Sequence, residues 1–136
     1  MSAEHTYDYA IIRVVPRVER GELINVGVIL SCPDVEFLEA GIEIDEPRLL
    51  ALDDALDVEA IRANLATIPV ICRGGPQAGP IGALAQRNRF HWLVSPRSTI
   101  IQMSPPHTGR TSDPRAALER LLDTMVRRPA SPPGAR

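Results

Sequence analysis

The stretch YDYAIIRVVPRVERGELINVGVIL, from Tyr7 to Leu30, decides the fold. Its two apolar runs, residues 7–15 and 24–32, have the composition and alternation of β-strands. The link between them is charged and contains Gly21, which suits the exposed tip of a hairpin. Both faces of the first run are mostly apolar, as in a strand covered on two sides. The stretch therefore predicts an antiparallel hairpin at the centre of a sheet.

The chain beyond this hairpin predicts further strands and several helices. Strands are expected over residues 36–44, 90–95 and 99–103, with Trp92 in the core and a polar loop after the last strand. In the first of these, even-numbered residues should face the core and odd-numbered residues should face outward. Short helices are expected over residues 48–54 and up to about Arg87, and residues 73–82 should form a loop. A longer helix should begin after Asp57 and end or kink at Pro69, and a last helix should begin at Asp113-Pro114.

These elements predict an α+β fold, an antiparallel sheet of about five strands with helices on one face. Residues 1–128 should form a single globular domain, and residues 129–136 a disordered tail, since the tail cannot build a core. The first residues contain no secretory signal, and no segment approaches the roughly 20 apolar residues of a membrane span. We therefore expect a cytoplasmic protein that does not associate with membranes.

Charge is distributed unevenly along the chain. Residues 34–59 carry ten acidic side chains and one basic side chain, whereas residues 60–112 carry six arginines and no acid. Helix caps and a solvated helix face account for the acidic run. The basic run hints at an anionic partner. The isoelectric point near 5.9 argues against nucleic-acid binding, which remains a third alternative through a local arginine patch.

The cysteines and histidines predict no metal centre. Cys32 and Cys72 lie far apart and belong to no paired motif, so we expect two buried, reduced thiols. The histidines His5, His91 and His107 are scattered rather than clustered at ligand spacing. We expect neither a metal nor another cofactor.

The densest run of hydrogen-bonding side chains is SPRSTIIQMSPPHTG, residues 95–109. Hydroxyls, an amide and an arginine together bind phosphate or carboxylate oxygens, although a turn-rich loop uses the same residue types. Arg13 adds a charge to an otherwise apolar strand face, and Gly27 opposite it would leave room for a ligand. Whether the hairpin residues share one cleft with residues 97–109 stays open. The candidate ligand-binding residues are Arg13, Asn25, Arg97, Ser98, Thr99, Gln102, His107 and Thr108.

Three segments, residues 7–30, residues 89–109 and the closing DPRAALERLL helix, resemble an uncharacterised bacterial family of short cytosolic proteins, a domain of unknown function. Members are often encoded beside a HipA-like kinase, so the resemblance implies a shared pathway or a complex with such a kinase. It implies no catalytic residues. The residues that recur in the family fall here on Arg13, Arg17, Glu19, Asn25, Gly27, Arg97, Ser98, Thr99, His107, Thr108 and Gly109.

The leading functional hypothesis is a cytosolic module that binds an anionic ligand or a partner protein, such as the HipA-like kinase, without catalysis. It rests on a polar cluster that has no catalytic constellation beside it. The alternative is an enzyme acting on a phosphoester or nucleotide. In that enzyme Arg97 and Arg13 would hold the phosphate and His107 would move a proton.

Overall fold

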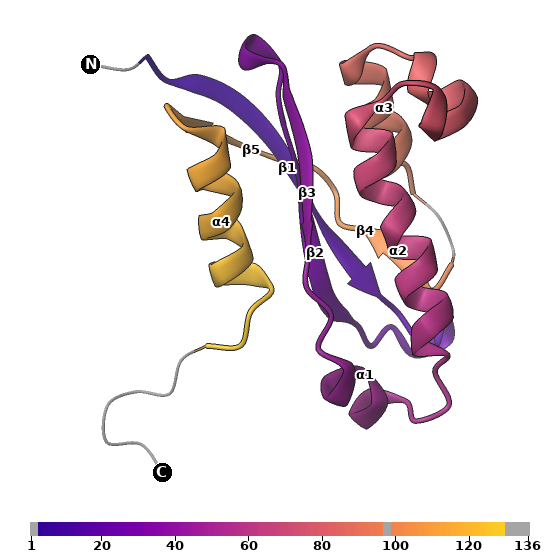
Figure 1. The fold of residues 1–136 in the computed structure, drawn as a ribbon. Helices are drawn as coiled ribbons and strands as arrows, with labels where there is room; N and C mark the ends of the chain where they lie inside the picture. Colours follow the sequence, from indigo (N-terminus) through magenta and orange to yellow (C-terminus); the bar gives the residue numbers. More distant parts are fainter. Residues whose placement is uncertain (1–2, 97–98, 130–136) are drawn as a thin grey trace, which may run out of the picture.

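The computed structural model describes residues 3–96 and 99–129, with a five-stranded antiparallel sheet at the centre (Figure 1). The spatial order is β3-β2-β1-β4, and β5 pairs with β1 further along the same edge as β4. This arrangement confirms the predicted α+β class and the central hairpin. Two parts of the sequence predictions lie outside the described residues. They are residues 130–136 of the predicted tail 129–136, and the candidate residues Arg97 and Ser98. The strands are β1 (His5–Val14), β2 (Ile24–Cys32), β3 (Phe37–Ile42), β4 (Ile101–Met103) and β5 (His107–Thr111).

The α-helices are α1 (Glu46–Leu52), α2 (Val58–Arg73), α3 (Gln86–Val94) and α4 (Pro114–Met125), and the short 3₁₀ segments are η1 (Val18–Arg20), η2 (Pro33–Val35) and η3 (Pro76–Ala83). Three of the α-helices begin after an aspartate, as predicted for Asp57 and Asp113. The carboxylates of Asp45, Asp57 and Asp113 each accept a hydrogen bond from the backbone N–H three residues further on. These bonds satisfy N–H groups that the first helical turn leaves unpaired.

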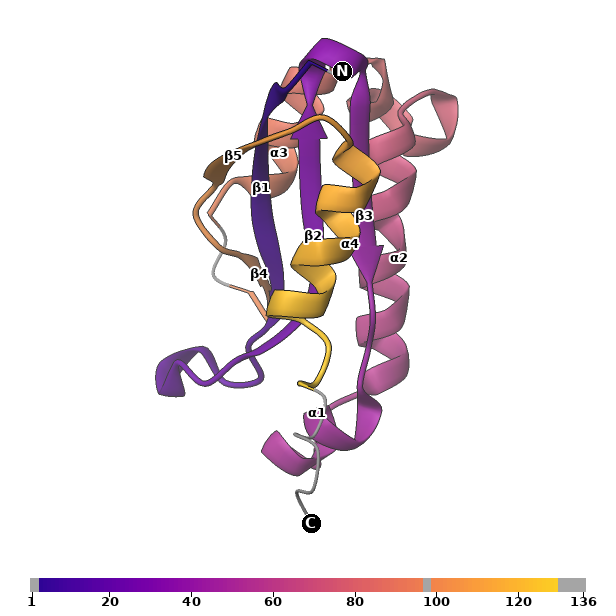
Figure 2. The same ribbon diagram turned by 90° about the vertical axis from the view of Figure 1, so that its left-hand side faces the viewer.

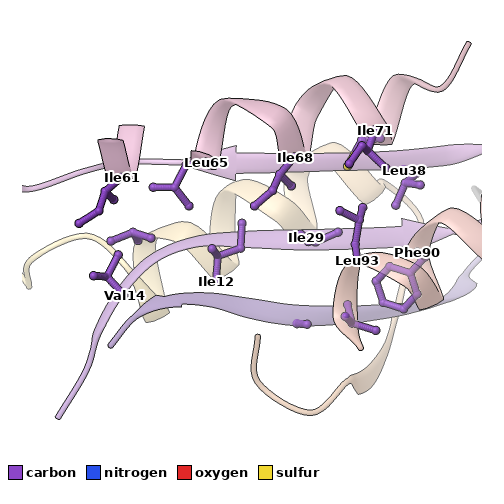
Figure 3. Packing of buried hydrophobic residues seen from close by; sticks show 14 of the residues in the cluster. Ile12, Val14, Ile29, Leu38, Ile61, Leu65, Ile68, Ile71, Phe90 and Leu93 are labelled. Carbon is purple, nitrogen blue, oxygen red and sulfur yellow. The ribbon is translucent and has the colours of Figure 1, made fainter. Parts of the chain in front are cut away.

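Helices cover both faces of the sheet, not only one as expected (Figures 1 and 2). On one face, Ile12, Val14 and Ile29 pack against residues of α2 and α3, as Figure 3 shows. On the other face, α4 packs its leucines against β2. The odd-numbered residues of β3, expected to face outward, meet α4 instead. Gly41 is the clearest case, because a Cβ there would lie 2.5 Å from Leu122 Cδ1.

One predicted strand is a helix instead, and α2 does not end at Pro69. Residues 90–94 belong to α3 rather than to a strand, and their buried members, Phe90, Leu93 and Val94, follow helical spacing. Trp92 is 39% exposed and is therefore not a core residue. Helix α2 continues through Pro69 to Arg73, and Gly74, with φ of 73°, follows its last residue.

Residues 101–111 follow one edge of β1 almost continuously. β4 pairs with the end of β1, and β5 pairs with its beginning. Between them, Ser104 keeps the pairing: its N–H donates to Ile11 O and its Oγ accepts from Ile11 N, both at 2.8 Å. Pro105 and Pro106 follow, and prolines are tolerated at a sheet edge because they have no N–H to donate. The predicted polar loop is therefore partly a strand.

Candidate functional site

Arg13, Asn25 and Gln102 lie side by side on three neighbouring strands. In the register, Arg13 of β1 stands opposite Asn25 of β2 on one side and opposite Gln102 of β4 on the other. Directly opposed residues of antiparallel strands project to the same face of a sheet. Ile12 and Val14 pack on the α2 side, so alternation places Arg13 on the α4 side. We call these three residues the Arg13 cluster.

A β-bulge in β2 brings Asn25 into this cluster. Ile12 pairs with Gly27, but Arg13 pairs with Asn25, so Val26 is the extra residue. Without the bulge, Val26 would stand opposite Arg13. Gly27, the residue expected from the sequence to stand opposite Arg13, pairs with Ile12 instead. Bulges commonly re-aim a side chain in this way. Gly27 is required for a different reason: a Cβ there would lie 2.5 Å from Gly41 O on β3.

The Arg13 cluster contains polar atoms that lack partners. Arg13 Nε and Asn25 Oδ1 are both buried without a hydrogen bond, and the guanidinium of Arg13 forms no ion pair with any described residue. Asn25 Nδ2 donates to Met125 O at 3.0 Å, and Gln102 Nε2 donates to Thr99 O at 2.8 Å. By contrast, many other arginines are paired with carboxylates: Arg17, Arg20, Arg62, Arg110, Arg115, Arg127 and Arg128.

The other described candidates lie apart from Arg13. His107 stands opposite Tyr9, and the two rings lie 5.4 Å apart, centroid to centroid. Tyr9 is four residues from Arg13, about 13 Å along a strand that rises ~3.3 Å per residue. Thr108 alternates to the opposite face, where its Oγ1 donates to Asp8 Oδ1 at 2.8 Å. Thr99 Oγ1 donates to Ile101 O at 2.7 Å, within the turn before β4.

Two residues that recur in the resembling family have structural roles here. Tyr7 lies over Gly109, where a Cβ would come within 2.5 Å of the tyrosine ring and its oxygen. The same phenolic oxygen accepts a hydrogen bond from Arg120 of α4 at 3.2 Å. Arg17 forms an ion pair with Asp53, the residue that follows α1, with Nε 3.3 Å from Oδ2. Packing against Tyr7 therefore explains Gly109, and the ion pair with Asp53 explains Arg17.

Sequence reasoning did not single out Ser104, which is 1% exposed and joins the edge strands to β1. Its role depends on a long-range pairing to Ile11, for which the local sequence carries no signal. The thiols of Cys32 and Cys72 are buried, as expected, and burial raises the pKa of Cys72 to about 12. A thiol with such a pKa is a poor nucleophile and metal ligand at neutral pH.

Within residues 3–96 and 99–129, no group of three or more His, Cys, Asp or Glu side chains could hold a metal ion. In the same part of the chain, the helices lack the combined length and apolarity that crossing a bilayer requires.

The chain is an α+β domain in which one antiparallel sheet lies between helices. The partly buried Arg13 cluster lies on β1 and its two neighbouring strands, β2 and β4. Residues 9–126 match the model of a family described as a protein of unknown function, DUF3037, and the chain belongs to that family. The match confirms that the resembling family is a domain of unknown function. No curated protein and no solved structure matches the chain significantly.

Proposed function

We propose that this protein binds a carboxylate or phosphate group at the Arg13 cluster. The observation that carries the proposal is the guanidinium of Arg13, which is partly buried and has no hydrogen bond or ion pair with any described residue. A guanidinium binds carboxylate and phosphate oxygens through two parallel hydrogen bonds. Native proteins seldom leave a buried donor unpaired, because each such group costs ~1–3 kcal/mol.

The neighbours of Arg13 suit an oxygen-rich ligand. The amides of Asn25 and Gln102 each have two N–H groups, and the backbone carbonyls of Met125 and Thr99 each accept a bond from one of these amide nitrogens. The remaining amide N–H groups can donate to a ligand. Asn25 Oδ1 is an unused acceptor, so a ligand with a hydroxyl or N–H beside its anionic group would satisfy both unpaired atoms.

The anionic group can belong to a small molecule or to an acidic side chain of a partner protein in the cytoplasm. The HipA-like kinase is the partner we propose to test, because the resemblance implies a complex or a shared pathway. Partner binding through the cluster predicts that the kinase co-purifies with the wild-type protein and is lost with Arg13→Met. Retention of the kinase by Arg13→Met would place any contact elsewhere.

A thermal-shift panel of phosphate, acetate, citrate and phosphoserine tests the small-molecule source. At ten times its dissociation constant, a ligand stabilises the folded state by about 1.4 kcal/mol. We expect at least one anion to raise the melting temperature of the wild type but not of Arg13→Met. Arg115→Met is the matched control, since Arg115 is exposed and paired with Glu39. The proposal fails if no anion distinguishes the wild type from Arg13→Met while the kinase also fails to bind.

The two alternatives lack a comparable observation. For the enzyme, the ring of His107 lies against Tyr9, well separated from Arg13 along the strand. For nucleic-acid binding, several arginines of the basic run already bind within the chain. Arg62 pairs with Glu46, and Arg89 donates to the carbonyls of Leu84 and Cys72. We therefore propose ligand binding at the Arg13 cluster as the function.

A further inference from the structure

A cleft of about 610 Å³ lies on the α2/α3 side of the sheet, the face opposite to Arg13. It is enclosed by α2, α3 and residues 99–103. Ile61 and Ile68 of α2, Leu93 of α3 and Met103 of β4 line it with apolar atoms. Figure 3 shows Ile61 and Ile68 projecting from α2 toward the sheet, with Leu93 on the Ile68 side and away from Ile61. Sequence reasoning did not predict this cleft, because it assigned residues 90–95 to a strand.

Two large apolar side chains line the cleft while remaining open to solvent. Trp92 is 39% exposed and Ile100 is 43% exposed. Exposed apolar side chains are ordinary when scattered, but these two line one concave surface. Burying them beneath a ligand would remove further apolar area from water, which is favourable by about 25 cal/mol per Å².

Most polar side chains of the described lining are already paired: those of Thr67, Ser95, Thr99 and Gln102 each donate a hydrogen bond to a backbone carbonyl. Asn64 also lines the cleft, and the amide of this side chain makes no hydrogen bond with any described residue. Asp57 is the only charged side chain among the described lining residues, and one of its oxygens caps α2 by accepting from Ala60 N. The described lining contains no arginine. Its single negative charge disfavours an anionic ligand, and its apolar walls disfavour any strongly hydrated one.

We propose that this cleft binds a small, neutral, mostly apolar molecule that hydrogen-bonds to Asn64 through one polar group. The volume lies within the ~300–1,000 Å³ of small-molecule sites, which are mostly apolar with a few polar groups that orient the ligand. Asn64 and Arg13 lie on opposite faces of the sheet, but Gln102 of the Arg13 cluster also lines the cleft, so the two proposed sites adjoin at β4.

The wild-type protein contains its own reporter for this site. Trp92 is the only tryptophan, and it lines the cleft. The neutral fluorophore N-phenyl-1-naphthylamine absorbs where tryptophan emits, so binding in the cleft quenches Trp92 and excites the probe by energy transfer. We expect saturable transfer at micromolar probe concentration. Absence of saturable transfer in the folded wild type would overturn the proposal.

Two variants with the same substitution test the location. Ala60 and Ala66 are both exposed residues of α2, but only Ala60 lines the cleft. A phenylalanine at residue 60 would fill part of the volume, so Ala60→Phe should weaken probe binding at least tenfold. Ala66→Phe should bind within twofold of the wild type. If Ala60→Phe does not fold, Thr67→Phe replaces it, since Thr67 is also exposed and lines the cleft. Equal affinity of the two phenylalanine variants would refute the assignment.

A matched pair of probes tests the ligand class. The anionic dye 8-anilinonaphthalene-1-sulfonate has the ring skeleton of N-phenyl-1-naphthylamine with one added sulfonate. The proposal predicts at least fivefold weaker binding of the sulfonate, because the carboxylate of Asp57 would repel it and the apolar walls would desolvate it. Equal or tighter binding of the sulfonate would overturn the neutral ligand class.

Discussion

Replacing Arg13 by methionine should make the free protein more stable while removing its anion site. Methionine has an unbranched side chain of similar length to the arginine stem and contains no N–H group. The substitution therefore removes the buried, unpaired Nε of Arg13 and keeps most of the packing of the methylene groups. Asn25 Oδ1 is unpaired in both proteins, so its cost cancels in the comparison.

The expected gain is about 1 kcal/mol. A buried, unsatisfied donor costs ~1–3 kcal/mol, and the partial exposure of Arg13 points to the lower part of that range. Against this gain, the variant loses the attraction between the cation of Arg13 and the C-terminal carbonyl groups of α4. The Arg13 cluster contacts this end of α4, because Asn25 donates a hydrogen bond to Met125 O. Such an attraction contributes ~0.3–1 kcal/mol. A net change of about 1 kcal/mol raises the melting temperature by about 4 °C in a domain of this size.

Urea denaturation followed by far-ultraviolet circular dichroism measures this change. The buffer should be Tris chloride without phosphate or carboxylate, so that no oxyanion occupies the site. Arg115→Met is the control, and its stability should be unchanged or slightly lowered because an exposed pair with Glu39 is lost. A loss of more than about 1 kcal/mol in Arg13→Met would show that the guanidinium is a structural requirement, which refutes the reasoning behind the anion site.

Three further predictions concern the framework around the site. Ser104→Ala should lower the unfolding free energy by about 1–3 kcal/mol, measured by urea denaturation, because Ile11 N loses its buried acceptor; a change within experimental error would contradict the edge-strand pairing. Gly109→Val should lower the melting temperature by several degrees, about what 1–3 kcal/mol of overpacking produces, because a Cβ there meets the ring of Tyr7. Cys72, whose pKa burial raises to about 12, should stay unmodified by iodoacetamide at pH 8 in the native protein and react after denaturation, as mass spectrometry would detect; rapid native labelling would contradict its burial.

The sequence predicted those elements whose signals are local. The hairpin followed from apolar alternation and a glycine-containing turn, and two helix starts followed from Asp57 and Asp113. Helix α3 was missed because Phe90, Trp92 and Val94 alternate like a strand, while its N-cap residue Ala85 has no side chain that could cap the helix. Only the burial of Leu93 beside Phe90 and Val94 distinguishes the helix.

The composition of the Arg13 cluster could be predicted only in part. Arg13 and Asn25 were both candidates, but their direct opposition depends on the bulge at Val26. Ile24, Val26 and Val28 alternate without interruption in the sequence, although Val26 and Val28 belong to different cores. Nothing in that alternation indicates where the strand shifts its register.

The position of the cluster follows from how little of the sheet one helix can cover. A helix is about 10 Å wide and strands lie about 4.8 Å apart, so a single helix covers about two strands. Helix α4 packs on β2 and β3, which leaves the β1, β4 and β5 side of that face less covered (Figure 2). Tyr9, Arg13 and Gln102 are accordingly only partly buried there. The same face of β1 therefore has a buried end at Tyr7, which Arg120 of α4 contacts, and an accessible end at Arg13. If the proposed ligand binds, we expect it to reach the Arg13 side chain from the part of this face that α4 leaves less covered.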